Sequence, residues 1–404
     1  MIILVLNCGS SSIKYQVLNM RTNSDYLLLA KGLVERIGQE TGVLSHRADG
    51  KEKYETECPV QNHTDGIKKV LDILVNPEFG VLKSLTEIQA VGHRVAHGGE
   101  FFNSSRLVDK DVIAGIEKLC EQAPLHNPAN LLGINAIETL LPGISQVAVF
   151  DTSFHQTMPN YAYMYAIPYE YYTKYKIRRY GFHGTSHKFV AKKACDLGGL
   201  DFEKSKVITC HLGNGGSIAA IKDGKSVDTS MGFTPLEGVI MGTRSGDLDA
   251  GIVTYIQEKE GLNAAGINAI LNKKSGFIGI YGKSSDVRDI ENAAAKGDER
   301  AILALNILYY RVLKYIGAYT AVMNGVDMIV FTGGIGENDP HIREMVGTHL
   351  QFIGVDFDVN ANKGVRGKDV ILTKPYSKVM MSAITTNEEL VIAQDTMSVI
   401  AAGK

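Results

Sequence analysis

The sequence predicts an α/β protein that contains a duplicated domain, and three observations indicate this fold class. Strand-like and helix-like segments alternate along the chain. The motif Asn7-Cys8-Gly9-Ser10 recurs as Asn214-Gly215-Gly216-Ser217, each time between an apolar run and a second strand-like run. Glycine accounts for 42 of 404 residues and gathers in short clusters. Because Asn-Gly-type turns are common in hairpins, two unrelated turns are the alternative explanation of the repeated motif.

The first half of the chain begins with a predicted hairpin. Ile2–Leu6 forms its first strand, and Ile13–Leu18 is expected to pair with it across a Gly/Ser turn. Farther along, Asn127 followed by Pro128 predicts a helix start, with the asparagine as the cap and the proline as the first helical residue. Val147–Phe150 predicts a buried strand that ends at Asp151.

The second half repeats this alternation. Val207–Leu212 and Met328–Phe331 are apolar runs that predict buried strands. Asp339-Pro340 is expected to cap the helix that follows the second of them. Near the end, Thr386-Asn387-Glu388-Glu389 predicts a capping box for a helix over Leu390–Ala401.

Composition excludes several classes of protein. The net charge of −2, from 42 basic and 44 acidic residues, lacks the basic excess of a dedicated nucleic-acid binder or a membrane-surface protein. The five cysteines are scattered without CxxC spacing, which argues against a disulfide framework or a zinc site and favours a reducing compartment. The opening residues lack the long apolar run of a signal peptide. We therefore expect a cytoplasmic protein that does not associate with a membrane.

The longest apolar stretch, Ala301–Met323, is expected to be a core helix. It carries Asn306, Arg311 and Lys314, and its large residues from Ile302 to Met323 recur every three or four positions. That period is typical of one buried helix face.

Unusual residues follow the apolar strands at five places. Ligands bind at the carboxyl ends of strands in open α/β sheets, so together these places predict a site. They are Asn7, Arg94, Asp151, the run His211–Gly215 and the run Gly333–Asn338.

The glycine-rich run Thr332–Asn338 joins a predicted strand to a helix N-terminus, which favours an anion such as phosphate. It lacks the third glycine of a dinucleotide fingerprint. Gly282-Lys283-Ser284 resembles the end of a P-loop, but Phe277 occupies the position of the first P-loop glycine. We expect phosphate binding without a P-loop, and an ordinary tight turn is the alternative for each run.

His183 lies just before a predicted helix that Thr185 or Ser186 could cap, which suits a donor to an anion, although a structural histidine is equally consistent. His183 and His187 lack the HExxH pattern of a zinc site. Arg94, Arg244 and Arg288 lie in Gly/Ser-rich settings, where arginine suits carboxylate or phosphate recognition. Each arginine alone could be a surface salt-bridge partner, but the three together favour a site that binds a carboxylate or a phosphate.

Eight tyrosines lie between Tyr161 and Tyr180, among four lysines and arginines. Stacking on nucleic acid and a partly exposed surface or subunit contact are the two interpretations. The slightly negative net charge favours the second.

Five motifs, in one order along the chain, resemble those of the acetate kinase family. They are Leu6–Lys14, the Gly-His-Arg-Val-Ala-His-Gly-Gly run from Gly92, Tyr180–His187, His211–Gly215 and Gly334–Asn338. The resemblance extends to Asn387-Glu388-Glu389-Leu390 and so covers essentially the whole chain.

This resemblance implies the duplicated ribonuclease-H-like fold of sugar kinases, the Hsp70 ATPase and actin, with the active site in the interdomain cleft. Residues 1–150 with 386–404 would form the N-terminal domain, and residues 151–385 the C-terminal, nucleotide-binding domain. The implied reaction is reversible phosphoryl transfer from ATP to acetate, giving ADP and acetyl phosphate. Mg²⁺ would assist, with Mn²⁺ as a substitute, and the protein would be a homodimer.

The resemblance also implies roles for individual residues. The catalytic group would be Arg94, Asp151, His183 and Arg244, and the magnesium-associated pair Asn7 and Glu388. The carboxylate would contact Arg94, Ala96, Leu125, Phe182 and Pro235. The ATP-binding residues would be Lys14, His211, Leu212, Gly213, Asn214, Gly215, Asp286, Val287, Arg288, Gly334, Ile335, Gly336, Glu337 and Asn338.

One position departs from the family pattern, because Ala96 replaces the valine that is usual in acetate-specific members. Propionate or another short-chain carboxylate is therefore an alternative substrate. Because the same fold serves ATP-driven binding modules and filament formers, a non-catalytic nucleotide switch is a second alternative. Several cationic residues expected around the γ-phosphate favour phosphoryl transfer over a switch.

Overall fold

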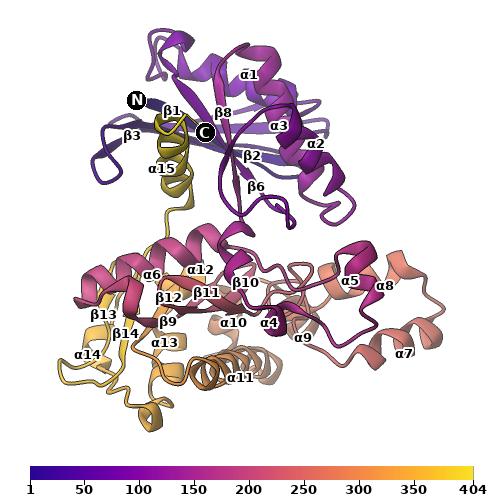
Figure 1. The fold of residues 1–404 in the computed structure, drawn as a ribbon, viewed down its shortest axis with the longest axis vertical. Helices are drawn as coiled ribbons and strands as arrows, with labels where there is room; N and C mark the ends of the chain where they lie inside the picture. Colours follow the sequence, from indigo (N-terminus) through magenta and orange to yellow (C-terminus); the bar gives the residue numbers. More distant parts are fainter. Residues whose placement is uncertain (404) are drawn as a thin grey trace. The chain divides into compact units, whose positions relative to one another are not determined.

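The computed structural model describes residues 1–403 and contains two sheets, one in each of two compact units. The first unit is Met1–Phe154 with Asn387–Lys404, and the second is His155–Thr386. Figure 1 shows the first unit in indigo and purple with one yellow helix, and the second from magenta through orange to yellow. Asp151 belongs to the first unit.

The sheet of the first unit has the order β5-β4-β3-β2-β1-β6-β8-β7. β1 pairs antiparallel with β2 and parallel with β6, and β6 pairs parallel with β8. The predicted strands Ile2–Leu6, Ile13–Leu18 and Val147–Phe150 are confirmed as β1, β2 and β8. The strands are β1 Ile2–Cys8, β2 Ser12–Met20, β3 Tyr26–Glu35, β4 Gly42–Ala48, β5 Tyr54–Cys58, β6 Ala90–Val95, β7 Arg106–Leu107 and β8 Ser145–Phe150.

Helices cover both faces of this sheet (Figure 1). On one face, Leu4, Leu6 and Val91 pack with residues of α1 and α3 in one apolar core. On the other, α15 packs against β1, β2, β6 and β8, and a Cβ at Gly92 would overlap Ile392 and Thr396 of α15. The helices are α1 His63–Leu74, α2 Lys110–Lys118, α3 Asn127–Leu140 and α15 Glu388–Ala401.

The sheet of the second unit has the order β11-β10-β9-β12-β14-β13. β9 pairs antiparallel with β10 and parallel with β12, and β12 pairs parallel with β14. The predicted strands Val207–Leu212 and Met328–Phe331 are confirmed as β9 and β12. The strands are β9 Lys206–Leu212, β10 Gly216–Lys222, β11 Lys225–Thr229, β12 Met328–Thr332, β13 Val370–Ile371 and β14 Met380–Ala383.

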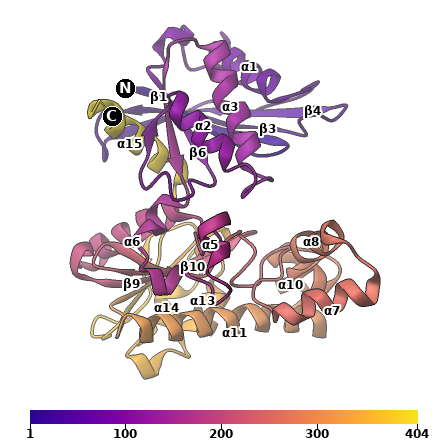
Figure 2. The same cartoon turned by 45° about the vertical axis from the view of Figure 1, so that its right-hand side comes forward.

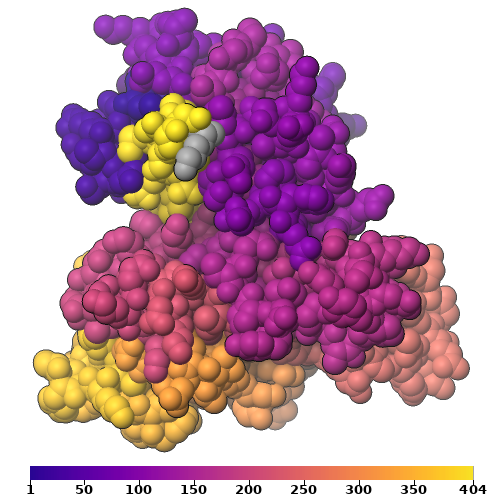
Figure 3. Space-filling view, viewed as in Figure 1, coloured from indigo at the N-terminus to yellow at the C-terminus, as the bar shows by residue number. Residues whose placement is uncertain are grey.

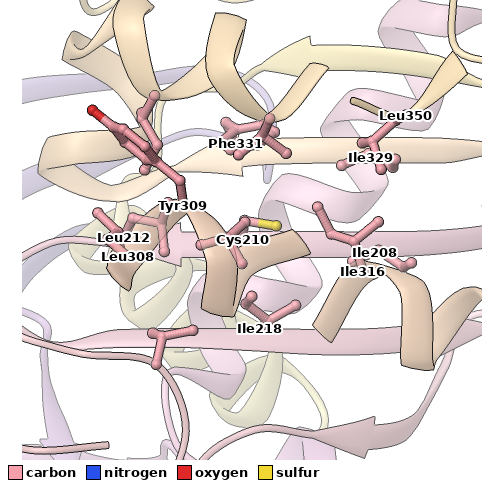
Figure 4. Packing of buried hydrophobic residues seen from close by; sticks show 14 of the residues in the cluster. Ile208, Cys210, Leu212, Ile218, Leu308, Tyr309, Ile316, Ile329, Phe331 and Leu350 are labelled. Atoms are coloured by element: carbon pink, nitrogen blue, oxygen red, sulfur yellow. The ribbon is translucent and has the colours of Figure 1, made fainter. Parts of the chain in front are cut away.

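The helix α11 forms much of the core of this unit. Figure 4 shows Leu308 and Ile316 of α11 lying over Ile208, Cys210 and Leu212 of β9. In the described part of the chain, α11 alone has the length and hydropathy of a membrane span, but its buried stripe belongs to this core. The core-helix prediction holds, except that Ile302 is 40% exposed.

The other helices of the second unit surround the sheet, and α7 and α8 lie together away from it (Figure 2). The helices are α4 Asn160–Tyr163, α5 Glu170–Tyr175, α6 Gly184–Gly198, α7 Ala250–Glu260, α8 Ala264–Lys273, α9 Gly276–Tyr281, α10 Val287–Ala294, α11 Glu299–Val322, α12 Gly333–Asn338, α13 Pro340–Gly347 and α14 Val359–Asn362.

The two units share one topology. The order β3-β2-β1-β6-β8 in the first corresponds to β11-β10-β9-β12-β14 in the second, with matching strand directions for all five members. The repeated Asn-x-Gly-Ser motif lies at the β1–β2 turn and at the β9–β10 turn. The repeat therefore marks equivalent hairpins, as expected of the duplicated ribonuclease-H-like fold.

Two predicted helix caps are wrong. Asn127 lies inside α3, after His126, and its amide bonds both the N–H and the C=O of His97 because it is fully buried beside that backbone. Asn387 rather than Thr386 caps α15, accepting from Leu390 N–H, since the Thr386 hydroxyl pairs with Ser186 Oγ and its N–H donates to Glu337. Asp339 caps α13 as predicted, accepting from His341 and Ile342.

Candidate active site

The first unit gathers three predicted site residues at the carboxyl ends of its parallel strands. Asn7 lies near the end of β1, Arg94 lies near the end of β6, and Asp151 follows β8. The Nε and Nη2 atoms of Arg94 donate to Asp151 Oδ2 at 3.0 and 2.5 Å, and Nη1 donates to Asn7 Oδ1 at 3.3 Å. The parallel pairing of β1, β6 and β8 brings these residues together.

Asp151 is fully buried, and its Oδ1 atom has no hydrogen-bond partner among the described residues. Burial raises the pKa of the Asp151 carboxyl, while Arg94 acts in the opposite direction. Burial alone would lower the pKa of Arg94, but Asp151 and Glu388 raise it above its ordinary value. Arg94 therefore stays cationic, and its Nε and Nη2 atoms are hydrogen-bonded to Asp151.

The first turn of α15 adds two carboxylates to this group. Glu388 is half-buried, and burial raises the pKa of its carboxyl, which Arg94 and Lys14 oppose. Glu389 pairs with Lys14 at 2.5 Å. Lys14, predicted as an ATP ligand, is therefore held by Glu389, which was not among the predicted site residues.

The acyl-pocket candidates of this unit differ in exposure. Ala96 is buried at 2% exposure, whereas Leu125 is 57% exposed. Asn130 accepts from the Ala96 N–H and donates to Cys8 C=O, which fixes the segment after β6 against the end of β1. His126 was not among the predicted site residues, although its charge lowers the pKa of Asp151. Its place beside Leu125 and the Asn-Pro helix start was the available signal.

In the second unit, His183 occupies the N-cap position of α6 with φ of 57°, a left-handed backbone unusual for a side-chain-bearing residue. Thr185 and Ser186, the expected caps, lie inside the helix. His183 Nδ1 lies 2.9 Å from Ser217 Oγ, and its ring stacks on His211 with centroids 4.3 Å apart. The strained backbone and two partners fix the imidazole in one place.

His183 and Arg244 converge on the turn after β9. A Cβ added at Gly215 would lie 3.5 Å from His183 Cε1 and 3.6 Å from Arg244 Nη1. Arg244 Nη1 also donates to Pro235 C=O at 3.1 Å. Phe182 packs with Met231 and Met241 beside them. Two potential donors thus face a glycine turn, an arrangement suited to an anionic group.

The turn after β9 also meets the glycine run after β12. A Cβ at Gly213 would lie 3.7 Å from Gly334 N, and one at Gly333, whose φ is 76°, would contact Leu212 C=O. The run Gly333–Asn338 is itself the short helix α12. Glu337 accepts from the N–H groups of Gly333 and Thr386 at 3.1 and 2.8 Å, so its carboxylate fastens the segment.

The third predicted ATP segment, Asp286–Arg288, begins α10, where Asp286 caps the helix and pairs with Arg288 at 2.6 Å. One turn later, Glu291 faces Asp339, the residue after Asn338. Burial, together with the charge and hydrogen bond of Asp339, raises the pKa of Glu291 to about 7, and Arg366 opposes this. The pair links α10 to the end of α12.

We expect Glu291→Gln to stabilise the protein at neutral and alkaline pH but not at pH 4.5 or below. The folded state favours the neutral form of Glu291, so this contribution to stability is complete below pH 4.5 and is lost as the pH rises through about 7. The gain at pH 8.5 should be about 1 kcal/mol, reduced by solvent screening of a half-exposed group. Thermal unfolding at pH 5, 7 and 8.5 measures it. Glu258→Gln, on the exposed side of α7, is the control; equal gains in both variants would contradict the prediction.

The tyrosine-rich segment lies at the surface of the second unit (Figure 3). Tyr161, Tyr169, Tyr171 and Tyr175 are 41–85% exposed. The lysines and arginines among them contact tyrosine rings, as Arg178 does over Tyr163 at 3.5 Å. The segment is a partly exposed aromatic surface.

Two sheets of one topology, with charged residues and glycine runs at their strand ends, define a duplicated ribonuclease-H-like α/β protein. The chain belongs to the acetokinase family, whose sequence pattern matches residues 2–394.

Among its relatives, acetate kinase of Bacteroides thetaiotaomicron is 56% identical over 398 residues, 98% of this chain and 99% of that protein. Acetate kinase of Thermoanaerobacter pseudethanolicus is 57% identical over 98% of both chains. Among solved structures, Porphyromonas gingivalis acetate kinase superposes with a TM-score of 0.95, at 51% identity and 99% coverage of each chain. A propionate kinase from Francisella tularensis gives 0.91 at 42% identity, covering 98% of this chain and 99% of that chain.

Proposed function

We propose that the protein catalyses the reversible transfer of the γ-phosphoryl group of ATP to acetate, giving ADP and acetyl phosphate. The observation that carries the proposal is the convergence of His183 and Arg244 on Gly215, in a chain that the acetokinase pattern matches over residues 2–394. A cytoplasmic homodimer fits this proposal, with the exposed tyrosines as a candidate subunit contact. The test is ADP release that requires both acetate and the protein.

The chemistry explains why cations dominate the candidate site. A carboxylate nucleophile is already ionised at neutral pH, so no strong general base is needed. The difficulty is to bring this anion to a polyanion and to stabilise charge on the phosphoryl group in transfer. Arg94 and Arg244 supply fixed positive charge, and His183 supplies a donor. Asp151 orients Arg94, to which it gives a buried partner.

The nucleotide is assigned to the second unit. The turn His211–Gly215 would face its phosphates together with Gly334–Gly336, because the two runs contact each other and a Cβ at Gly334 would meet open space. Asp286–Arg288 and Asn338 would hold the rest of the nucleotide, since Glu291 and Asp339 link their helices.

The first unit offers oxygen ligands that suit Mg²⁺. Asp151 Oδ1 is buried without a partner, and the side chains of Asn7 and Glu388 lie on the same group around Arg94. Residues 1–403 contain no cluster of three or more His, Cys, Asp or Glu side chains fit for a metal. That fits Mg²⁺, which keeps several waters and binds through one or two carboxylates plus substrate phosphates. When bound, it would neutralise phosphate charge.

Glu388→Ala should raise the Mg²⁺ concentration for half-maximal rate about tenfold, as loss of a supporting carboxylate does elsewhere. The comparison is Glu299→Ala, which removes a first-turn carboxylate from α11. Both variants lose a helix-dipole interaction of about 0.3–1 kcal/mol. Steady-state rates over a Mg²⁺ series decide the question: an unchanged requirement in Glu388→Ala would leave this residue only a helix-stabilising role.

Propionate is the alternative substrate, favoured by the buried Ala96 and by the likeness to a propionate kinase. We expect acetate as the main substrate, propionate within about tenfold in kcat/KM, and butyrate much poorer, because one methylene is worth about 1–3 kcal/mol. Ala96→Val should shift the choice towards acetate by about 1 kcal/mol. Kinetics on the three acids measure both. A higher kcat/KM for propionate than for acetate would make propionate the main substrate. An unchanged ratio of the two kcat/KM values in Ala96→Val would show that Ala96 does not line the acyl pocket.

A further inference from the structure

The segment from Ser230 to Asp249, between β11 and α7, contains neither helix nor strand. It carries both Pro235 and Arg244, the acyl-pocket and catalytic candidates of this unit. Long irregular segments inside a compact domain are usually functional, and their shape depends on side-chain contacts. Whatever holds this segment therefore sets the position of two site residues.

Arg179 holds the start of the segment. Its Nη1 atom donates to the C=O groups of Thr229, Ser230 and Met231 at 2.8, 3.1 and 3.2 Å. Its Nη2 atom donates to Glu237 Oε1 at 2.5 Å. The Arg179 side chain is only 16% exposed, so these bonds are poorly screened by solvent. One guanidinium thus ties residues 229–231 to residue 237.

Tyr165 completes the contact from the other side. Its hydroxyl donates to Glu237 Oε2 at 2.5 Å and accepts from Phe233 N–H at 3.0 Å. Burial is the main cause that raises the pKa of this phenol, so it stays protonated and donates. Glu237 therefore accepts on both carboxylate oxygens. A Cβ at Gly232 would overlap Glu237 and the Tyr165 hydroxyl, so the segment folds back tightly at that glycine.

The same fold-back also holds the segment that carries Phe182, another acyl-pocket candidate of this unit. The C=O of Gly232 accepts from the N–H groups of Tyr180 and Gly181 at 3.1 and 3.2 Å. Phe182 follows directly and packs with Met231. At the other end, the Pro235 C=O, two residues before Glu237, accepts from Arg244. Phe182, Pro235 and Arg244 are thus all connected to one hydrogen-bonded group.

We propose that Tyr165, Arg179 and Glu237 are positioning residues that set the size of the acyl pocket and the place of the Arg244 guanidinium. This inference rests on the proposed function, because it assigns a role within the same site. The three residues have no described contact with the predicted ATP segments His211–Gly215, Asp286–Arg288 or Gly334–Asn338. Their loss should therefore affect the carboxylate and leave ATP binding unchanged.

The test is Tyr165→Phe, which removes one hydroxyl and keeps the ring. We expect kcat/KM for acetate to fall about tenfold, as for loss of a hydrogen bond to a charged group. Because Pro235 would be held less firmly, the ratio of kcat/KM for propionate to that for acetate should also rise at least about threefold. KM for ATP should stay within about twofold of the original protein. Tyr310→Phe, 63% exposed on α11, is the matched control and should change none of these.

Glu237→Gln provides a second variant, which keeps the side-chain shape but weakens the bond to Arg179, and it should shift the acid ratio in the same direction. The inference is overturned if both variants keep the acid ratio, if they raise KM for ATP and acetate equally with a lower melting temperature, or if neither folds. These results differ from failure of the proposed function, in which the unaltered protein itself forms no acyl phosphate and the inference falls with it.

Discussion

Arg244→Ala should keep the fold and lose about 10³–10⁵ in kcat, the usual value of a well-placed arginine in phosphoryl transfer. Arg244 and His183 face Gly215 from two different segments, and the Arg244 guanidinium is held by the Pro235 C=O. Loss of this hydrogen bond should lower the free energy of unfolding by about 1 kcal/mol. If Arg244 were only a surface salt-bridge partner, Arg244→Ala would leave kcat unchanged and would alter stability by about 0–1 kcal/mol.

Steady-state kcat, with thermal unfolding alongside, measures this effect. Arg47→Ala, an exposed arginine on β4, is the matched control and should retain full turnover. Turnover of Arg244→Ala close to that of the control would reject the catalytic role, and loss of the folded protein would show that Arg244 supports the segment Ser230–Asp249.

Arg94→Ala should affect both turnover and stability. Asp151 is fully buried, and Arg94 donates two hydrogen bonds to its carboxylate. Removing one partner of a buried ion pair leaves an uncompensated charge and costs about 3–5 kcal/mol. Because a neutral carboxyl is easier to bury, the loss of stability should be larger at pH 8 than at pH 5.

A double variant separates the two effects. Arg94→Met with Asp151→Asn removes the buried charge together with its partner, so most of the stability should return while turnover stays at least about 10³-fold low. Chemical unfolding and kcat of the single and double variants are the measurements. Recovery of turnover together with stability would mean that Arg94 serves the fold alone.

The sequence was informative where the signal was local. The apolar runs that became β1, β8, β9 and β12 are buried strands because most of the side chains in each are apolar. The convergence of Asn7, Arg94 and Asp151 followed from one rule, that parallel strands share a carboxyl edge.

Long-range polar contacts were not predictable in this way. Asn127 has the sequence signature of a cap, yet its side-chain amide forms hydrogen bonds with the backbone of His97, thirty residues away. Thr386 does not cap the helix because its hydroxyl pairs with Ser186 and its N–H donates to Glu337, both on other elements. The group of Tyr165, Arg179 and Glu237 spans 72 residues of sequence and has no local pattern. Such contacts depend on the packed chain and not on neighbouring residues.

The most direct test of the central claim is trapping of the acyl phosphate with hydroxylamine. The protein, ATP, Mg²⁺ and acetate should give acetyl hydroxamate in amounts that match the ADP formed, and omission of any one component should abolish it. Arg244→Ala should form it at least about 10³-fold more slowly. ADP released without hydroxamate, whatever acid is supplied, would contradict phosphoryl transfer to a carboxylate and identify a nucleotide switch instead.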